Sequence, residues 1–468
     1  MRPHRSVDDD RFRQRNEGVS VMKNGRKRWA RRGVVAAAVV VTGAVLAPLT
    51  SPALAAETTT TWRDPVRSLD RAAHPLRSTE PGRNTADLRA LGGMIADAKV
   101  VGLGEATHGS HEFFTMKERV FRYLVEEKGF RAFALELSWS AGLEIDEYVQ
   151  TGRGDAREIA KRTLAGSPWD REEFVSLIRW MRDHNRAHPD RTVHFVGDDL
   201  GAPSVNDAFF ARITDYIGRH HPEALPRLNE LYTGLRPIDD AFAYVRKPVD
   251  ERRRLATQAE QAFELVKGLA GADAYGWTEQ HARFVAQTAR FLAVDLADPK
   301  GLPAAQILRD QAMAQNVAWW QRRTGHKILL SAHNAHVAYI PDMPSIYPKT
   351  QGAFLRETLG RGYLPIGFSF DRGSFLSKDT AVGGEWKPFS VPSAPSGTNE
   401  DTLDRVRFDD FYLDLRTAPP AARAWLDTAR PTRTIGTLFP VDPADISLGR
   451  SYDVVIHLHD VRQADLRR

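Results

Sequence analysis

A carboxylate and an imidazole stand three residues apart where an apolar run ends. The stretch VVGLGEATHGSHEFF (100–114) leaves its apolar part at Gly104 and continues with Glu105 and His108. Histidine is the side chain whose ordinary pKa suits proton transfer near neutral pH, and a neighbouring carboxylate can orient and polarise its ring. The pair predicts acid–base chemistry. Each residue alone also suits the start of a helix, where a glutamate is favoured by the helix dipole.

Three further apolar runs also end in polar groups. Glu136 ends the second run, GFRAFALE, where we expect burial that would make an unpaired carboxylate costly. Asp198 and Asp199 end the third run, and His333 and His336 follow the fourth in SAHNAH, where the alternative is a pair of ordinary loop histidines. Ligands of an open parallel sheet bind beyond the carboxyl ends of its strands. We therefore expect these groups to meet in one cleft.

Two basic residues stand among apolar neighbours in predicted helices. Lys117 lies on the apolar face of the helix expected at 110–128, so it either extends to solvent or meets a buried carboxylate. We expect the second, with Glu105 or Glu136 as its partner. Arg309 begins the helical run RDQAMAQNVAWW. We predict substrate contacts for both residues, against the alternative that Arg309 is simply solvated.

The elements that must position these residues alternate between strands and helices. Helical patterns separate four short apolar runs, and residues 363–370 and 452–460 resemble further strands. This alternation predicts an α/β fold with a mostly parallel sheet flanked by helices. Residues 205–300 are polar, with long helical patterns, and indicate an inserted helical subdomain. The four runs are 99–103, 131–135, 192–196 and 327–330.

The distribution of charge excludes nucleic acid as the expected partner. The 468 residues carry a formal charge of +5, but residues 1–55 hold eleven basic against four acidic side chains, which leaves −2 for the remainder. A body that is not basic lacks the electrostatic footprint of a nucleic-acid-binding protein. The chain has no Cys, so a disulfide, a thiol nucleophile and a cysteine-bound zinc are all excluded.

The N-terminal region predicts export. MKNGRKRWARRG is a basic segment, residues 34–49 are apolar but short for a membrane span, and Ala53-Leu54-Ala55 forms an A-x-A cleavage site. We expect residues 1–55 to be a signal peptide, 56–74 a linker and 75–465 the main folded domain. The mature protein would then be secreted, without stable membrane association; the alternative is an uncleaved anchor.

Several motifs together resemble the erythromycin esterase family. They are GLGEATHGSHEFF, GFRAFALE and HNAH, and RDQAMAQN and IGFSFDRGSF extend the likeness over about residues 75–465. The resemblance implies an α/β core with a helical subdomain over a deep cleft, and hydrolysis of a macrolide lactone ester without a covalent acyl-enzyme. It also implies acid–base roles for Glu105, His108 and Glu136, a second histidine pair at His333 and His336, and a cleft arginine at Arg309. Lys117 stands where some members have arginine, and a lysine cannot offer a bidentate fork to a carboxylate.

The expected mechanism is attack by water rather than by a serine. No G-x-S-x-G elbow is present, so we expect His108 to activate water against a small-molecule ester, with no cofactor and no metal. One alternative is a metallohydrolase that uses the Glu105-x-x-His108 and His333-x-x-His336 pairs. Their spacing differs from H-E-x-x-H, and a buried lysine would oppose a cation. A second alternative is a secreted ligand-binding protein without catalysis.

Overall fold

The structure is a computed structural model that describes residues 65–200, 205–269 and 275–467. The predicted signal peptide, 1–55, lies outside these ranges, as does the first part of the predicted linker, residues 56–64 of 56–74. None of the helices in the described ranges is long and apolar enough to cross a membrane.

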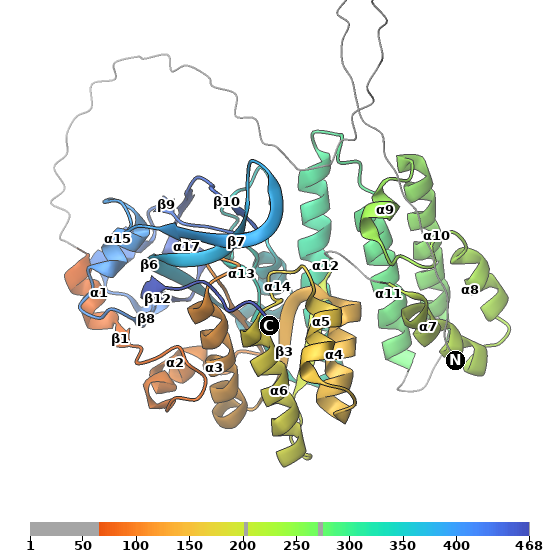
Figure 1. Cartoon of the computed structure of the whole chain (residues 1–468), viewed down its shortest axis with the longest axis horizontal. Helices are drawn as coiled ribbons and strands as arrows, with labels where there is room; N and C mark the ends of the chain where they lie inside the picture. The colour runs from red at the N-terminus through yellow and green to blue at the C-terminus, as the bar shows by residue number, and fades with distance from the viewer. Residues whose placement is uncertain (1–64, 201–204, 270–274, 468) are drawn as a thin grey trace, which may run out of the picture. The chain divides into compact units, whose positions relative to one another are not determined.

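A ten-stranded sheet forms the centre of the fold (Figure 1). Six neighbouring strands run parallel, in the order β12-β6-β2-β5-β3-β4, and antiparallel strands join at β12 and β6. The mostly parallel sheet predicted from the sequence is therefore confirmed. The parallel strands are β2 (Val100–Leu103), β3 (Phe130–Ser138), β4 (His194–Asp199), β5 (Lys327–Ser331), β6 (Tyr363–Asp379) and β12 (Val454–Val461). The remaining members of this sheet are β1 (His74–Pro75), β7 (Gly383–Val391), β8 (Phe411–Asp414) and β10 (Leu438–Phe439).

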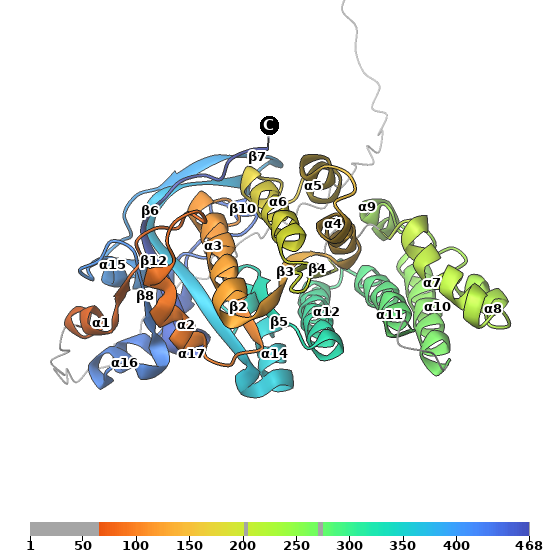
Figure 2. The same ribbon diagram turned by 90° about the horizontal axis from the view of Figure 1, so that it is seen from below.

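The parallel strands form continuous apolar runs because both faces of the sheet are covered. Successive side chains of one strand enter different cores. Val101 and Leu103 of β2 pack with one set of helices, whereas Val100 packs with another. Figure 2 shows α3 and α6 on one side of the sheet and α12 on the other. The helices of the first side are α2 (Arg89–Ile95), α3 (His111–Lys128), α4 (Trp139–Thr151), α5 (Ala156–Leu164) and α6 (Glu172–Ala187).

Helix α3 follows its sequence signals closely. It starts after Ser110 and ends at Gly129, which takes a φ of 70° in the left-handed region that glycine adopts without strain. The predicted bounds were 110–128. Because α3 directly follows the turn that carries Glu105 and His108, its packing fixes that turn.

The predicted helical subdomain is confirmed for the described part of 205–300. Five helices pack together as a bundle, green in Figure 1, in which α11 lies against α12 (Gly301–Thr324). Their apolar residues continue the core that covers one face of β5 and β3. The five are α7 (Asp207–His220), α8 (Leu225–Leu231), α9 (Ala241–Val245), α10 (Val249–Gly268) and α11 (Tyr275–Leu292).

The structure differs from the sequence-based expectation at two places. Residues 66–72, expected within a linker, form α1 (Val66–Ala72), whose Leu69 is fully buried. The strand expected at 363–370 continues to Asp379 and turns back as β7. The remaining elements are α13 (Asn334–Val337), α14 (Gln351–Leu359), α15 (Asn399–Asp404), α16 (Pro420–Leu426), α17 (Leu448–Ser451), β9 (Arg430–Thr432), β11 (Ala444–Ile446) and the short 3-10 turns 86–88, 360–362 and 415–417.

Candidate active site

A cavity of about 330 Å³ lies beyond the carboxyl ends of β2, β3 and β5. It brings together five of the residues singled out in the sequence, although β2 and β5 are more than 200 residues apart along the chain. These five are His108, Glu136, Arg309, His333 and His336. The rest of the lining comes from Ala335, Met343, Tyr347, Thr434, Gly436, Thr437, Leu438, Val441 and Asp442.

The turn after β2 holds His108 rigidly against Glu105. Nδ1 of His108 lies 2.6 Å from Oε1 of Glu105, and the glutamate is completely buried. Gly109 is needed in this turn, because a Cβ there would lie 2.0 Å from the backbone oxygen of Leu376. The amide of Ile435 donates to the oxygen of Ala106 at 3.0 Å, which fastens a loop of the cavity wall to the same turn.

The hydrogen bond to Glu105 determines which nitrogen of His108 can act as a base. Burial alone would raise the pKa of Glu105, but the charge of Lys117 and the bond to His108 lower it. The carboxylate is therefore ionised and accepts the Nδ1 proton. The lone pair of a neutral His108 is then on Nε2. A Cβ placed on Gly436 would lie 3.9 Å from this atom, so glycine keeps the space beside it open.

Lys117 is the buried partner of Glu105. Its Nζ donates to Oε2 of Glu105 and lies 3.4 Å from the oxygen of Ala332. Burial lowers the pKa of Lys117, and the charge of Glu105 opposes that effect. One of the two partners expected from the sequence is thus found. Lys117 is buried and is not among the residues that line the cavity, so its observed partner is Glu105, and the predicted substrate contact stays a prediction.

Glu136 and Arg309 form a buried ion pair in the cavity wall. Nη2 of Arg309 lies 2.8 Å from Oε1 of Glu136 and 2.6 Å from Oδ2 of Asp199. The other oxygen of Glu136 accepts the backbone amide of His333 at 2.9 Å. Burial would raise the pKa of Glu136, but the charges of His336 and Arg309 hold it well below its usual value. Glu136 therefore joins β3, α12 and the HNAH turn as an ionised acceptor.

His333 lines the cavity and carries a buried N–H group without a partner among the described residues. Its Nδ1 accepts the amide of Ala335 at 3.2 Å, so the neutral ring carries its proton on Nε2. Nε2 is buried and has no hydrogen-bond partner in the described part of the chain. Burial is the main cause that lowers the pKa of His333 to about 3. The two rings are 4.9 Å apart between centroids, which places an unused donor beside the candidate base.

His336 is the member of the histidine pair that contacts two carboxylates. Nδ1 lies 2.8 Å from Oδ1 of Asp310, and Nε2 lies 3.4 Å from Oε1 of Glu136. Burial would lower the pKa of His336, but Asp310 and Glu136 raise it well above the ordinary value. The raised pKa favours the imidazolium form, whereas Nη1 of Arg309, a donor 3.2 Å from Nε2, favours the neutral ring with its proton on Nδ1. The amide of Gln351 donates to the same oxygen of Asp310 at 2.7 Å and fixes its position.

Three members of this site were not identified as site residues from the sequence. Asp199 was noted only as the end of an apolar run, and its contact with Arg309 depends on where α12 crosses β4. Asp310 adjoins Arg309, yet nothing in its spacing distinguishes it from a solvated helix residue. The segment 434–442 lines the cavity from a part of the chain without a strand or helix pattern of its own.

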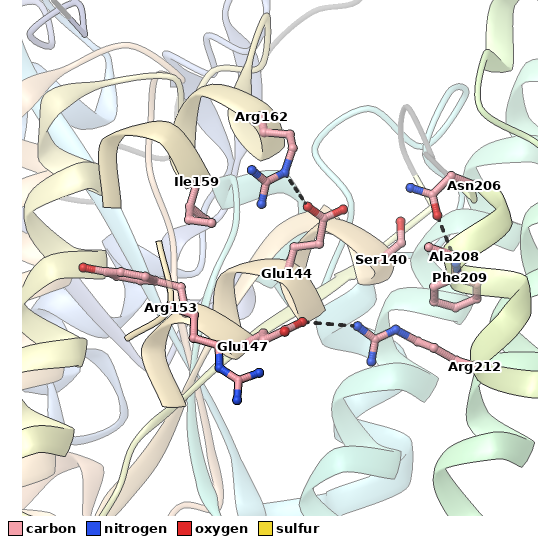
Figure 3. Close-up of a pocket in the computed structure, with 11 residues that line it drawn as sticks. Ser140, Glu144, Glu147, Arg153, Ile159, Arg162, Asn206, Ala208, Phe209 and Arg212 are labelled. Atoms are coloured by element: carbon pink, nitrogen blue, oxygen red, sulfur yellow. Dashed lines mark hydrogen bonds and ion pairs between the residues drawn. The ribbon is translucent and has the colours of Figure 1, made fainter. Parts of the chain in front are cut away.

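A second cavity of about 410 Å³ lies between α4, α5 and α7, and it lacks comparable chemistry (Figure 3). Its two glutamates form ion pairs with arginines: Glu144 lies 2.8 Å from Arg162, and Glu147 lies 3.6 Å from Arg212. Its lining contains no histidine. We therefore assign the candidate active site to the smaller cavity at the strand ends.

The candidate donor sets for a metal also lie elsewhere. Within 65–200, 205–269 and 275–467, two groups of His, Asp and Glu side chains bring three ligand atoms within 4.8 Å of one another. Neither group includes a residue of the cavity wall. In the cavity, Glu105 is already bound to His108 and Lys117, and Glu136 to Arg309.

The fold and this site define a class of α/β protein with paired histidines and carboxylates in a cleft at the strand ends. Comparison with known proteins gives the family. The sequence model described as Erythromycin esterase matches residues 125–461, which include Glu136, Arg309 and both later histidines. The chain belongs to the erythromycin esterase family, and this membership supports a hydrolase kind of activity. The match begins after the turn that carries Glu105 and His108.

Individual relatives agree with this assignment. The chain is 22% identical over 372 residues to erythromycin esterase type II of Escherichia coli, which covers 74% of this chain and 87% of that protein. It is 30% identical to a crystal structure described as a succinoglycan biosynthesis protein, with a TM-score of 0.77 over 86% of this chain and 98% of the other. The erythromycin esterase mutant EreC in its open conformation is 18% identical, with a TM-score of 0.64 over 83% and 98% of the two chains, and shows the shared fold.

Proposed function

We propose that the protein hydrolyses a carboxylic ester, with a macrolide lactone as the leading substrate, by attack of a water activated by His108. The observation that carries the proposal is the His108–Glu105 hydrogen bond of 2.6 Å in the wall of the cavity. It keeps the proton on Nδ1 and the lone pair on Nε2, as a general base requires. The name of the family and its curated relatives supports the substrate class.

The proposed reaction needs no covalent acyl-enzyme. Nε2 of His108 takes a proton from water as the water oxygen bonds to the ester carbonyl carbon. The carbonyl oxygen becomes an oxyanion, which Nε2–H of His333 stabilises because that donor has no protein partner. The tetrahedral intermediate then expels the alkoxide, which takes a proton from His108 or His336. The products are an acid and an alcohol, joined in one molecule when the substrate is a lactone.

The rim of the cavity suits a substrate with a large apolar surface. Met343, Leu438 and Val441 line the cavity and are more than a third exposed. Exposed apolar groups gathered at one opening are typical of a ligand-binding surface. A macrocycle would cover them. The description of one relative as a succinoglycan biosynthesis protein favours an ester on a sugar conjugate as the second candidate substrate.

The decisive experiment is incubation of the purified chain with macrolides, acylated sugars and simple esters, followed by mass spectrometry. Hydrolysis of a lactone adds one water to the mass. In water labelled with oxygen-18, the new acid should carry one labelled oxygen, and no acyl-enzyme should accumulate. No turnover of any ester would favour the alternative of a ligand-binding protein. Activity lost to a chelator and restored by a divalent ion would favour the metallohydrolase.

We also propose that the protein is exported, with cleavage after Ala55. The order of basic segment, apolar segment and A-x-A site in residues 22–55 supports this. Sequencing the N-terminus of protein from the culture medium should give Ala56 as the first residue. Recovery of only the uncleaved chain from cells would reject the proposal.

A further inference from the structure

A second cluster of ionisable side chains lies away from the cavity, where α15 covers β6 and β12. In the parallel register of these strands, Phe370 faces Leu458 and Arg372 faces Asp460, so Asp371 and His459 lie side by side. Asp404, the last residue of α15, lies over them. One ligand atom from each of Asp371, Asp404 and His459 lies within 4.8 Å of the other two.

Hydrogen bonds within the cluster orient His459 and Asp404 toward each other. Nδ1 of His459 lies 2.6 Å from Oδ1 of Asp404, and Nε2 of the buried His457 lies 3.3 Å from the same oxygen. His457 is fixed from behind by Ser369, whose Oγ lies 3.1 Å from Nδ1. Asp404 is thus held by two imidazoles.

Asp371 contains the least satisfied atom of the cluster. Its side chain is 3% exposed, and Oδ1 accepts the amide of Ala394 at 2.8 Å. Oδ2 is buried and accepts no hydrogen bond in the described part of the chain. The nearest cation is Nη1 of Arg372 at 3.9 Å, and Nε of that arginine lies 3.2 Å from Oδ2 of Asp460. A buried carboxylate oxygen without a hydrogen-bond donor costs folding free energy. Binding of a cation to Oδ2 would remove that cost.

We propose that Asp371, Asp404 and His459 bind a divalent transition-metal ion, with Zn²⁺ as the best-matched ion. Two carboxylates and one imidazole form a mixed oxygen and nitrogen donor set, which suits Zn²⁺ and its neighbours better than the oxygen-preferring Mg²⁺ or Ca²⁺. The ion would replace the proton between His459 and Asp404. Bonds of about 2.1 Å at a tetrahedral angle hold two ligand atoms about 3.4 Å apart, so Nδ1 of His459 and Oδ1 of Asp404, now 2.6 Å apart, must separate by about 0.8 Å.

The other candidate cluster is a weaker metal site. His111 there has both nitrogens occupied by carboxylates, with Glu173 at 2.6 Å and Glu80 at 3.0 Å. An imidazolium satisfies both contacts without an ion. At Asp371, by contrast, no imidazole reaches the buried oxygen.

The proposed ion has a structural role. It would join β6, β12 and α15, and Arg433 donates to the backbone oxygen of Asp371 immediately before Thr434 enters the cavity wall. The ion would therefore support one wall of the cleft without touching a substrate. The site stands independently of the proposed esterase activity.

The test measures zinc binding to the full, untagged chain after dialysis against a chelator. Isothermal titration with Zn²⁺ should show one site per chain, which excess Mg²⁺ does not displace. His459→Ala and Asp371→Asn should each weaken binding at least about tenfold, in the range found when metal-site partners are lost. The matched control is His220→Ala, which removes an exposed histidine from α7 and should leave the affinity unchanged.

Folding and activity are checked on the same samples. Circular dichroism should show that Asp371→Asn and His459→Ala are folded, and any esterase activity should persist in His459→Ala. The proposal is overturned if the wild-type chain binds no Zn²⁺, if both variants bind it as tightly as the wild type, or if His220→Ala weakens binding equally. Displacement by Mg²⁺ would also overturn it.

Discussion

Oε1 of Glu105 lies 2.6 Å from Nδ1 of His108, while Oε2 of the same carboxylate accepts Nζ of Lys117. One fully buried carboxylate therefore connects the candidate base to a buried cation. The lysine keeps the carboxylate ionised, and the carboxylate keeps the Nδ1 proton in place. This arrangement makes the function of His108 dependent on a residue that does not line the cavity.

Replacing His108 with Ala should abolish ester hydrolysis while the fold persists. Loss of a general base costs about 10²–10⁴ in rate, and loss of the group that also positions the water adds to this. The side chain borders the cavity, so its removal leaves little unfilled core. His108→Gln should not restore activity, because an amide cannot accept the proton. Steady-state kinetics and circular dichroism check both variants, and a folded His108→Ala protein with near-normal turnover would refute the assignment.

Removing only the charge of Lys117 should destabilise the protein more than removing both charges of the Glu105–Lys117 pair. Lys117→Met leaves a buried carboxylate without its cation, which costs about 3–5 kcal/mol. The double variant Glu105→Gln/Lys117→Met removes both charges and should lose less than the sum of the single variants. Urea unfolding of the four proteins measures this coupling.

An exposed ion pair provides the control for this cycle. Lys267 lies 3.0 Å from Glu264 on the surface of α10, where a pair contributes about 0–1 kcal/mol. Lys267→Met should therefore change the unfolding free energy only slightly. Additive effects at Glu105 and Lys117 would show that the buried pair is not coupled.

The sequence predicted the part of the fold whose signals are local. The inner strands such as β2 and β5 are apolar throughout because helices cover both faces, so they stand out in the sequence. β7 was missed because GGEWKPFSV contains a proline and alternates too weakly, and it is positioned by pairing with the extension of β6. α1 was missed because seven residues give too little helical pattern, and its Leu69 is buried by partners far along the chain.

The sequence likewise predicted those residues of the candidate site whose signals are local. Glu105, His108, Glu136, His333 and His336 follow apolar runs, and the parallel sheet explains why their positions converge. The contact of Asp310 with His336 depends on the crossing of α12 and the HNAH turn, which no local pattern encodes. Lys117 was placed beside a carboxylate by its apolar helical face, but only the tertiary structure shows that its partner is Glu105.

Asp310 should act as a positioning residue for the charge on His336. Asp310→Asn keeps an oxygen for Nδ1 and for the amide of Gln351 but removes the negative charge. The pKa of His336 should fall, since Asp310 is the strongest influence that opposes its burial. If the imidazolium donates a proton during turnover, the alkaline limb of kcat/KM against pH should move to lower pH. The exposed Asp190→Asn provides the control, and an unchanged profile in folded Asp310→Asn would refute this role.

A histidine outside the cavity should make stability depend on pH. His111 begins α3 and lies against Glu173, Glu80 and Asp465, with Nδ1 2.6 Å from Glu173 and 3.7 Å from Asp465. Burial alone would lower the pKa of His111, but hydrogen bonds to Glu173 and Glu80 raise it above 6.5, while Arg462 opposes them. The folded chain therefore holds this proton at a pH where the unfolded chain has released it. Its stabilising effect is complete below about pH 6.5 and is lost as pH rises through the higher pKa of the folded state.

Comparing variants isolates this contribution from that of other histidines. The unfolding free energy of the wild type, measured in urea between pH 5.5 and pH 9, should exceed that of His111→Gln most at the acid end, and the difference should shrink as the pH rises. His220→Gln, at an exposed position, should run parallel to the wild type. Glu112 also faces this region; burial raises the pKa of Glu112 and the charge of His111 lowers it, so the difference between wild type and His111→Gln includes this coupled contribution. A difference between wild type and His111→Gln that is constant over the whole range would show that His111 contributes packing and not a proton-dependent contact.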